Sequence, residues 1–360
     1  MKSVAVFGGY GTFGRLVCRE LAGLGIPVVV VGRDRQRARA LADTLGAGHD
    51  ALAADARDAR SCRAALAGRS VGVLCAGPFH ELGEAFLEAC LQERCHYVDI
   101  ADDRQYVARV RAWGARFAGH GLVAATGCSS LPGISGALAL AASEGRTVPP
   151  GHARVLLFIG HDNPKGRGAV QSLLEVVGQP FTTPQGRRVV FRGRTQATLP
   201  PPFGTRSFYD LDSPEYDLLP GLVGVSAVTV KVGFEWDVVN RAFALLARLP
   251  PRVRRASAAL LARAGGMAPR FGSSGGAVLT ELSGNGADAP RDGHRSWAAA
   301  VARRDGQRMA ALPCALAAAR LTGASGARAP MAGAVTAYEL IGATPLLRAL
   351  EGAGFEVLVG

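Results

Sequence analysis

The run Val6-Phe-Gly-Gly-Tyr-Gly-Thr-Phe-Gly-Arg15 decides the fold of the first part of this 360-residue chain. A hydrophobic segment at 3–7 leads into it, and an amphipathic segment at 13–24 follows. This order predicts a strand, a glycine turn and a helix. In such a turn the first glycine permits a sharp bend, the second leaves space for a pyrophosphate, and the third lets the helix pack closely on the strand.

The N–H groups at the start of this helix, together with the helix dipole, favour a phosphate group. We therefore interpret the run as a dinucleotide-binding turn, and a purely structural turn is the alternative. The predicted cofactor contacts are Gly9, Gly11, Thr12, Phe13 and Gly14.

The end of the second predicted strand distinguishes NAD from NADP. The β-branched run at 26–31 is typical of a buried parallel strand, and Arg33, Asp34, Arg35 and Arg37 follow it. An acidic residue at this point binds the ribose 2′-OH of NAD, whereas the 2′-phosphate of NADP requires a cation. Arg33 favours NADP(H). Asp34 is the competing ribose ligand, but it can instead cap the helix predicted at 35–45.

Apolar and helical segments keep alternating up to residue 126. Further strands are predicted at 50–55, 71–75, 96–100 and 122–126, and further helices at 83–94 and 104–118. This alternation predicts an α/β fold with a Rossmann doubly wound parallel sheet of strand order 3-2-1-4-5-6.

Two strand ends carry further cofactor candidates. Asp55 could accept a hydrogen bond from the adenine amine, or it could cap a turn. A small, rigid turn follows the fourth strand, where the nicotinamide half of the cofactor would pass. Its residues are Cys75, Ala76, Gly77 and Pro78.

After residue 126 the pattern becomes that of a second, α+β domain. Strands are predicted at 154–160, 188–192, 224–233, 297–303 and 355–359, and helices at 134–143, 241–249, 251–264 and 308–321. The stretch 199–220, rich in proline and aromatic residues, is predicted to be a long loop that lines a binding site or covers the second sheet. We expect an NADP-binding domain at 1–133, a substrate or dimerisation domain at 134–330, and a C-terminal segment at 331–360 that can return to the first domain.

Composition argues against several classes of protein. No apolar run approaches the ~20 residues of a membrane span, and no signal peptide precedes the first strand, so we expect a cytoplasmic protein. The net charge is +12, but the chain has only three lysines, and its arginines are scattered without a recognition motif for nucleic acid. We expect no nucleic-acid partner. The basic charge would instead steer an anionic cofactor or an acyl-phosphopantetheine-type substrate.

The seven cysteines form neither a CxxC pair nor a cluster at zinc spacing. They lie within apolar runs, which is typical of reduced, buried thiols. We expect no metal.

Six ordered motifs in the first 135 residues give the chain a family resemblance. They are Gly9-Tyr-Gly-Thr-Phe-Gly-Arg15, Val31-Gly-Arg-Asp34, Cys75-Ala-Gly-Pro-Phe79 with Gly83, Glu88-Ala-Cys-Leu91, His96-Tyr-Val-Asp-Ile100 and Gly127-Cys-Ser-Ser-Leu-Pro132. In these motifs the chain resembles the saccharopine dehydrogenase-like oxidoreductases, including their trans-acting enoyl reductase-like members. The resemblance implies NADP(H) redox chemistry.

Two motifs depart from that family. Relatives often have Gly-Glu where this chain has Ala101-Asp102-Asp103, and an acidic residue where it has Cys128-Ser129. We therefore expect that polar contacts that relatives make there are absent or replaced. For this reason the substrate of a relative is not assigned to this chain.

Three residues are candidates for catalysis, because a reductase must supply a proton beside the nicotinamide. His80 follows the Gly-Pro-Phe turn and could act as the general acid, although it could be a solvated loop residue. Tyr97 and Asp99 are two residues apart on one strand and face the same side. Asp99 could orient an acid or a water, or it could be buried with a backbone partner.

These observations predict an NADPH-dependent oxidoreductase that reduces a C=N or C=C bond of a small or carrier-bound metabolite. The alternative is an NADP-binding regulatory or scaffold protein without turnover. A helix-rich alanine surface makes a homodimer plausible.

The position of Arg33 gives a first prediction. Arg33→Ala should weaken NADPH binding by about 1 to 3 kcal/mol, the scale of a charge-assisted contact, and leave NADH binding nearly unchanged. Titration of cofactor fluorescence measures both affinities. An equal loss for the two cofactors would refute the assignment of Arg33 to the 2′-phosphate.

Overall fold

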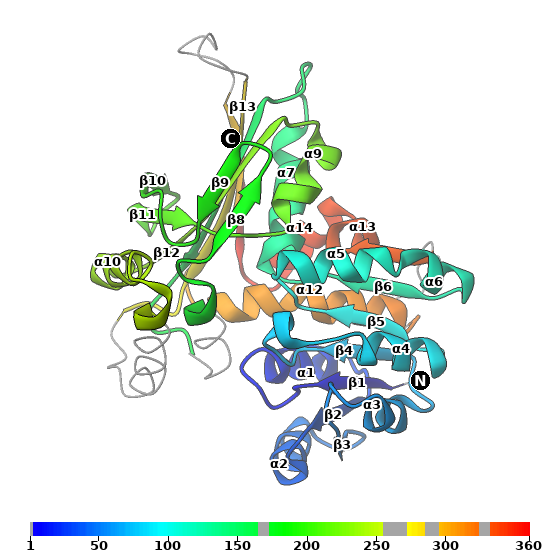
Figure 1. The fold of residues 1–360 in the computed structure, drawn as a ribbon. Coiled ribbons are helices and arrows are strands. Elements are labelled where there is room, and N and C mark those ends of the chain that lie inside the picture. The colour runs from blue at the N-terminus through cyan, green and yellow to red at the C-terminus, as the bar shows by residue number, and fades with distance from the viewer. Residues whose placement is uncertain (1–2, 165–172, 255–271, 285–294, 324–331) are drawn as a thin grey trace. The chain divides into compact units, whose positions relative to one another are not determined.

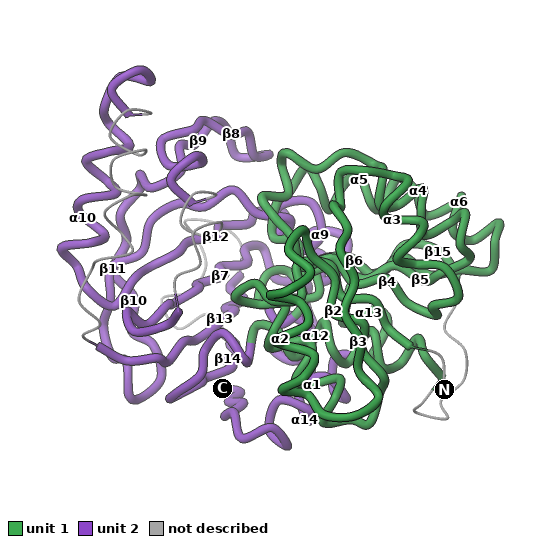
Figure 2. Tube along the Cα trace, turned by 90° about the horizontal axis from the view of Figure 1, so that it is seen from below, with its two compact units in different colours: residues 1–133, 310–342 green, residues 134–309, 343–360 purple. Residues whose placement is uncertain are grey.

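The computed structural model describes residues 3–164, 173–254, 272–284, 295–323 and 332–360. The chain forms two compact units, which Figure 2 distinguishes by colour: residues 1–133 with 310–342, and residues 134–309 with 343–360. Among the described residues, no helix has both the length and the apolar character that crossing a bilayer requires.

Unit 1 is built on a seven-stranded sheet in the order β15-β6-β5-β4-β1-β2-β3 (Figure 1). All of its strand pairs are parallel. The strands are β1 (Val4–Phe7), β2 (Val28–Gly32), β3 (Asp50–Ala53), β4 (Val71–Leu74), β5 (His96–Asp99), β6 (Val123–Thr126) and β15 (Gly333–Thr336). The predicted order 3-2-1-4-5-6 and the Rossmann fold class are confirmed, and β15 extends the sheet beyond β6.

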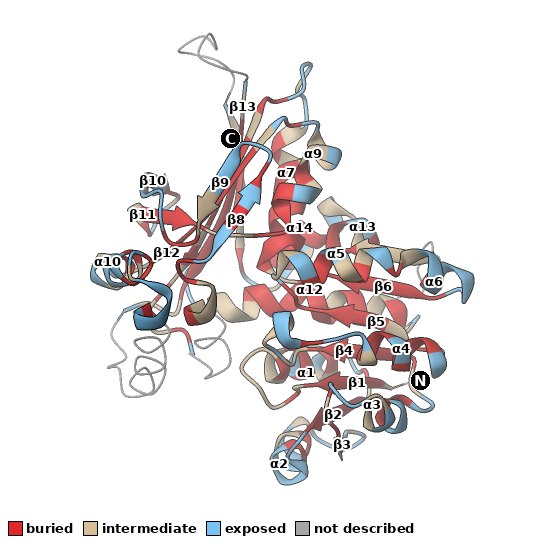
Figure 3. Ribbon diagram, in the orientation of Figure 1, coloured by how far each residue is buried: buried red, intermediate tan, exposed pale blue. Residues whose placement is uncertain are grey.

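The helices of unit 1 lie between these strands in sequence, except for the last one, which follows β15. They are α1 (Gly14–Gly23), α2 (Arg35–Leu45), α3 (Ala59–Leu66), α4 (Ala85–Gln92), α5 (Arg104–Ala112), α6 (Gly114–Gly119) and α13 (Ala337–Ile341), with the short turns η1 (Phe79–Glu81) and η2 (Ser130–Ile134). Asp34, Asp58 and Asp103 cap α2, α3 and α5 by accepting backbone N–H groups. The Val-rich strands β1, β2 and β4 are buried throughout (Figure 3), which explains their unbroken apolar runs.

Unit 2 contains a mixed seven-stranded sheet in the order β10-β11-β12-β7-β13-β14-β16. Its strands are β7 (His152–Ile159), β10 (Thr195–Leu199), β11 (Gly204–Asp210), β12 (Ala227–Phe234), β13 (Gly276–Ser283), β14 (Ser296–Ala302) and β16 (Glu356–Val359), and a separate hairpin pairs β8 (Pro180–Thr183) with β9 (Gly186–Val189). Its helices are α7 (Ser135–Ser143), α9 (Glu215–Val223), α10 (Asp237–Leu246) and α14 (Ala343–Gly352), and α12 (Gly306–Leu321) continues from this unit into unit 1. Helix α7 packs on β13 and β14, and α9 packs on β12.

The prediction of a long loop at 199–220 is wrong, because this stretch contains β11 and α9. Its aromatic residues are buried: Phe208 is 0% and Tyr216 is 1% exposed. Burial of these rings outweighs the prolines that suggested a loop, and Pro220 lies inside α9. The helix predicted at 251–264 lies outside the described residues from position 255 onward.

Two glycines of α1 give a matched test of the packing. A Cβ on Gly14 would lie 2.1 Å from the carbonyl oxygen of Gly8, whereas a Cβ on Gly23 would meet nothing within 4 Å. We expect Gly14→Ala to lower the free energy of unfolding by about 1 to 3 kcal/mol through overpacking. Gly23→Ala should be neutral or slightly stabilising. Urea unfolding of both variants measures the difference, and equal stability of the two would contradict the packing.

Candidate cofactor and active site

The turn between β1 and α1, residues 8–14, presents backbone N–H groups, and we call it the backbone cradle. Gly8 has φ of 71°, and the N–H of Gly11 donates to the Gly8 carbonyl at 2.8 Å, which closes the turn. No side chain caps α1, and within the described part of the chain the N–H groups of Thr12, Phe13 and Gly14 have no protein acceptor. These are the residues predicted to contact a cofactor, and their N–H groups suit an anion.

The close approach of Gly8 to the end of β4 brings a second predicted segment to the cradle. A Cβ on Gly8 would lie 2.7 Å from the backbone nitrogen of Ala76, and the Cys75 N–H donates to the Phe7 carbonyl at 2.9 Å. The turn of Cys75, Ala76, Gly77 and Pro78 therefore lies directly beside the glycine turn. The sequence analysis did not include Gly8 among the site residues, although the adjacent glycines Gly8 and Gly9 indicated a turn at this position.

At the end of β2, Arg33 and Asp34 are both exposed. The Asp34 carboxylate accepts the N–H of Arg37 at 3.1 Å and caps α2. The Asp34 N–H donates to the Tyr10 hydroxyl at 3.1 Å. This geometry supports the capping interpretation of Asp34 and leaves Arg33 as the exposed charged residue that directly follows β2.

Asp55 takes part in the turn before α3. Its carboxylate accepts the N–H of Arg57 at 3.0 Å, and its carbonyl accepts the Ser61 hydroxyl at 3.1 Å. The structure thus shows the turn role of Asp55, which was the alternative to an adenine contact.

Asp99 and Tyr97 lie at the carboxyl end of β5, and both are 0% exposed. One Asp99 oxygen accepts the N–H groups of Ala101 at 2.9 Å and Gly127 at 2.8 Å. The other accepts the hydroxyls of Tyr97 and Thr126, each at 2.7 Å. Burial raises the pKa of Asp99, and these hydrogen bonds oppose that shift. Asp99 therefore joins the end of β5 to the turn that follows β6.

Tyr106 links this buried network to the turn that carries His80. The hydroxyls of Tyr97 and Tyr106 are 3.0 Å apart, and the Tyr106 ring lies 5.1 Å from the Phe79 ring between centroids. Phe79 begins η1, in which His80 is exposed. Arg109 donates to the carbonyl of Leu82 at 2.7 Å, which holds the segment just after η1. Of the three catalytic candidates, only His80 reaches the surface of unit 1.

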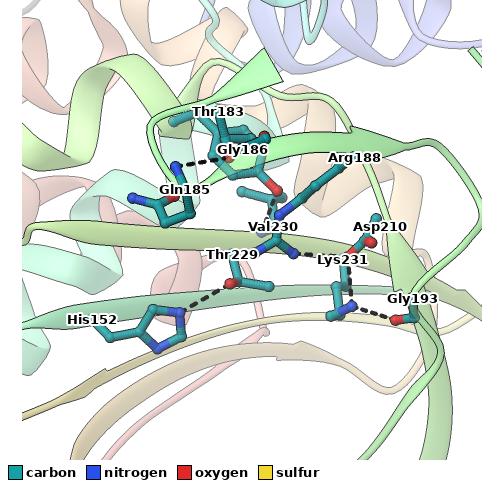
Figure 4. Close-up of polar contacts among 11 residues, drawn as sticks. His152, Thr183, Gln185, Gly186, Arg188, Gly193, Asp210, Thr229, Val230 and Lys231 are labelled. Carbon is teal, nitrogen blue, oxygen red and sulfur yellow. Dashed lines mark hydrogen bonds and ion pairs between the residues drawn. The ribbon is translucent and has the colours of Figure 1, made fainter. Parts of the chain in front are cut away.

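A second polar cluster lies within unit 2 (Figure 4). Lys231 of β12 and Asp210 of β11 form an ion pair at 2.6 Å, and Arg188 contacts the same carboxylate at 3.3 Å. Burial lowers the pKa of Lys231, and Asp210 opposes that shift. Lys231 also donates to the carbonyl of Gly193. These bonds tie the segment before β10 to the sheet, so the cluster is a structural ion pair.

The backbone cradle fits the pyrophosphate of a dinucleotide. It lies where the strand order reverses, since β1 is flanked by β2 and β4, and this is where doubly wound sheets bind nucleotides. A Cβ on Gly11 would lie 3.0 Å from the Gly8 carbonyl oxygen, so a side chain there would crowd the turn. The fold and the cradle define a dinucleotide-binding Rossmann unit.

Residues 4–121 match the family model of the saccharopine dehydrogenase NADP binding domain. The family resemblance found in the sequence is confirmed, and NADP(H) is the cofactor.

The fold has a counterpart among solved structures. The chain is similar to apo histidine-tagged saccharopine dehydrogenase (L-Glu forming) from Saccharomyces cerevisiae, with a TM-score of 0.65, 12% identity and coverage of 100% of both chains. A short chain dehydrogenase/reductase family protein matches 34% of this chain and 72% of its own length, with 20% identity and a TM-score of 0.30. No curated protein matches the chain.

The Asp99 network gives a stability prediction. Asp99→Ala leaves two buried N–H groups without an acceptor and should cost at least about 3 kcal/mol. Asp99→Asn keeps an oxygen for both N–H groups and should cost about 1 to 2 kcal/mol. Asp43→Ala, at an exposed residue, is the control and should change stability by less than about 0.5 kcal/mol. Urea unfolding measures all three variants, and a tolerated Asp99→Ala would show that the network is dispensable.

Proposed function

We propose that the protein is an NADPH-dependent reductase of a C=N or C=C bond in a small or carrier-bound metabolite. The observation that carries this proposal is the cradle of free N–H groups beside the Cys75–Pro78 turn, in a domain of an NADP-binding family. Bound NADPH supplies a hydride, and the protein must position the acceptor and provide a proton.

Each part of the site has a separate task in this proposal. The N–H groups of Thr12, Phe13 and Gly14 hold the pyrophosphate, and Arg33 binds the 2′-phosphate. The backbone of the Cys75–Pro78 turn flanks the reacting end of the cofactor. A net charge of +12 favours an anionic substrate, such as one carried on a phosphopantetheine arm.

His80 is the proposed proton donor, because it is exposed and follows the turn that flanks the cofactor. An imidazole titrates near neutral pH and can deliver a proton to the reduced substrate. Tyr97 and Asp99 are positioning residues in this proposal. Their closed network supports Tyr106 and, through the Phe79 ring, the turn that carries His80.

One observation favours the alternative of an NADP-binding regulatory or scaffold protein. Tyr97 and Asp99, two of the three candidate catalytic residues, are fully buried and bonded to each other. In this alternative NADPH binds without turnover.

We further propose a cytoplasmic location and a homodimer, and sedimentation of the purified protein tests the dimer.

Single-turnover assays distinguish the two functions. NADPH is mixed with a panel of amino-acid-derived imines and enoyl thioesters, and its absorbance is followed. We expect oxidation of NADPH by at least one class, with His80→Gln slowing that step by about 10²-fold or more. His120→Gln, at an exposed histidine that directly follows α6, is the control and should leave the rate unchanged.

NADPH that binds in stoichiometric amount but is oxidised by no member of the panel would support the regulatory alternative. Oxidation with an unchanged rate in His80→Gln would keep the reductase and remove His80 from the proton transfer.

A further inference from the structure

The ring of Tyr10 packs against the end of β2 and fills the space that a side chain at position 32 would occupy. A Cβ on Gly32 would lie only 2.3 Å from a ring carbon of Tyr10. The guanidinium of Arg37 stacks on the ring of Tyr10, and its central carbon is 4.6 Å from the ring centroid. Tyr10 is the residue between Gly9 and Gly11, so one side chain connects the glycine turn to the end of the second strand.

The hydroxyl of Tyr10 has one hydrogen bond still to make. It accepts the Asp34 N–H at 3.1 Å, which uses an oxygen lone pair and leaves its own hydrogen available to donate. Nothing in the described ranges accepts that hydrogen. The Asp34 carboxylate is turned to the start of α2, where it accepts the Arg37 N–H at 3.1 Å.

The charges around this hydroxyl are cationic. Arg33, Arg35 and Arg37 are all exposed, and none of them pairs with a carboxylate in the part of the chain that the structure describes. Arg39, two residues after Arg37 in α2, differs in this respect because it pairs with Asp43 and Asp50. A free O–H donor beside unpaired guanidinium groups suits a dianion such as a phosphate monoester.

We propose that Tyr10 is a specificity-determining residue, whose hydroxyl donates to the 2′-phosphate of NADP(H) and whose ring holds Arg37 against the same phosphate. Arg33, which directly precedes Asp34 and is exposed, contributes a further positive charge. Tyr10 is thus part of the glycine turn and also recognises the 2′-phosphate. This inference depends on cofactor binding alone and is independent of the reaction proposed above.

Binding of cofactor fragments tests this role without any substrate. Adenosine 2′,5′-bisphosphate carries the 2′-phosphate, and adenosine 5′-monophosphate lacks it. We expect Tyr10→Phe and Arg37→Ala each to weaken binding of the bisphosphate about tenfold in calorimetry, the effect of losing one hydrogen bond to a charged group. Both variants should bind the monophosphate within about twofold of the unchanged protein.

Arg39→Ala is the matched control, since it removes the same charge from the same helix. It should bind both fragments as the unchanged protein does. Equal weakening of both fragments by Tyr10→Phe, or no weakening of either, would overturn the proposal. Thermal unfolding without ligand identifies a variant that has lost its fold, and in that case the exposed Arg37 variant decides the question alone.

Discussion

The absence of a side chain at Gly14 is the constraint on which the rest of unit 1 depends. Because a Cβ there would lie 2.1 Å from the Gly8 carbonyl oxygen, only glycine lets α1 begin this close to β1. The N–H groups at the start of the helix then have no acceptor among the residues that the structure describes. The same glycine turn contacts the backbone after β4, so packing and cofactor binding share one set of close backbone contacts.

Asp99 is the centre of a buried polar network in unit 1. Two N–H groups and two hydroxyls converge on its carboxylate in a region without exposure to solvent. Such a fully bonded network rigidifies its surroundings, because any displacement would leave buried donors unpaired. The network fixes the turns after β5 and β6 and reaches the His80 turn through Tyr106 and Phe79.

Sequence patterns predicted the Rossmann unit well, since its strands are buried on both faces and read as continuous apolar runs. They also predicted that Tyr97 and Asp99 share a face, because that follows from the geometry of one strand. The partners Thr126, Gly127 and Tyr106 come from other elements, so the closed network required the structure. In unit 2, burial of Phe208 and Tyr216 against the sheet outweighed proline signals, and β13 depends on its pairing with β7 and β14.

Hydrogen–deuterium exchange of the full-length protein, with and without NADPH, tests most directly whether the glycine cradle and the end of β2 form the cofactor site. We predict slower exchange with NADPH at the amides of Thr12, Phe13 and Gly14, which have no acceptor among the described residues. We also predict slower exchange at 33–37, with a smaller effect there for NADH. Unchanged exchange in both segments at saturating NADPH would contradict this assignment of the cofactor site.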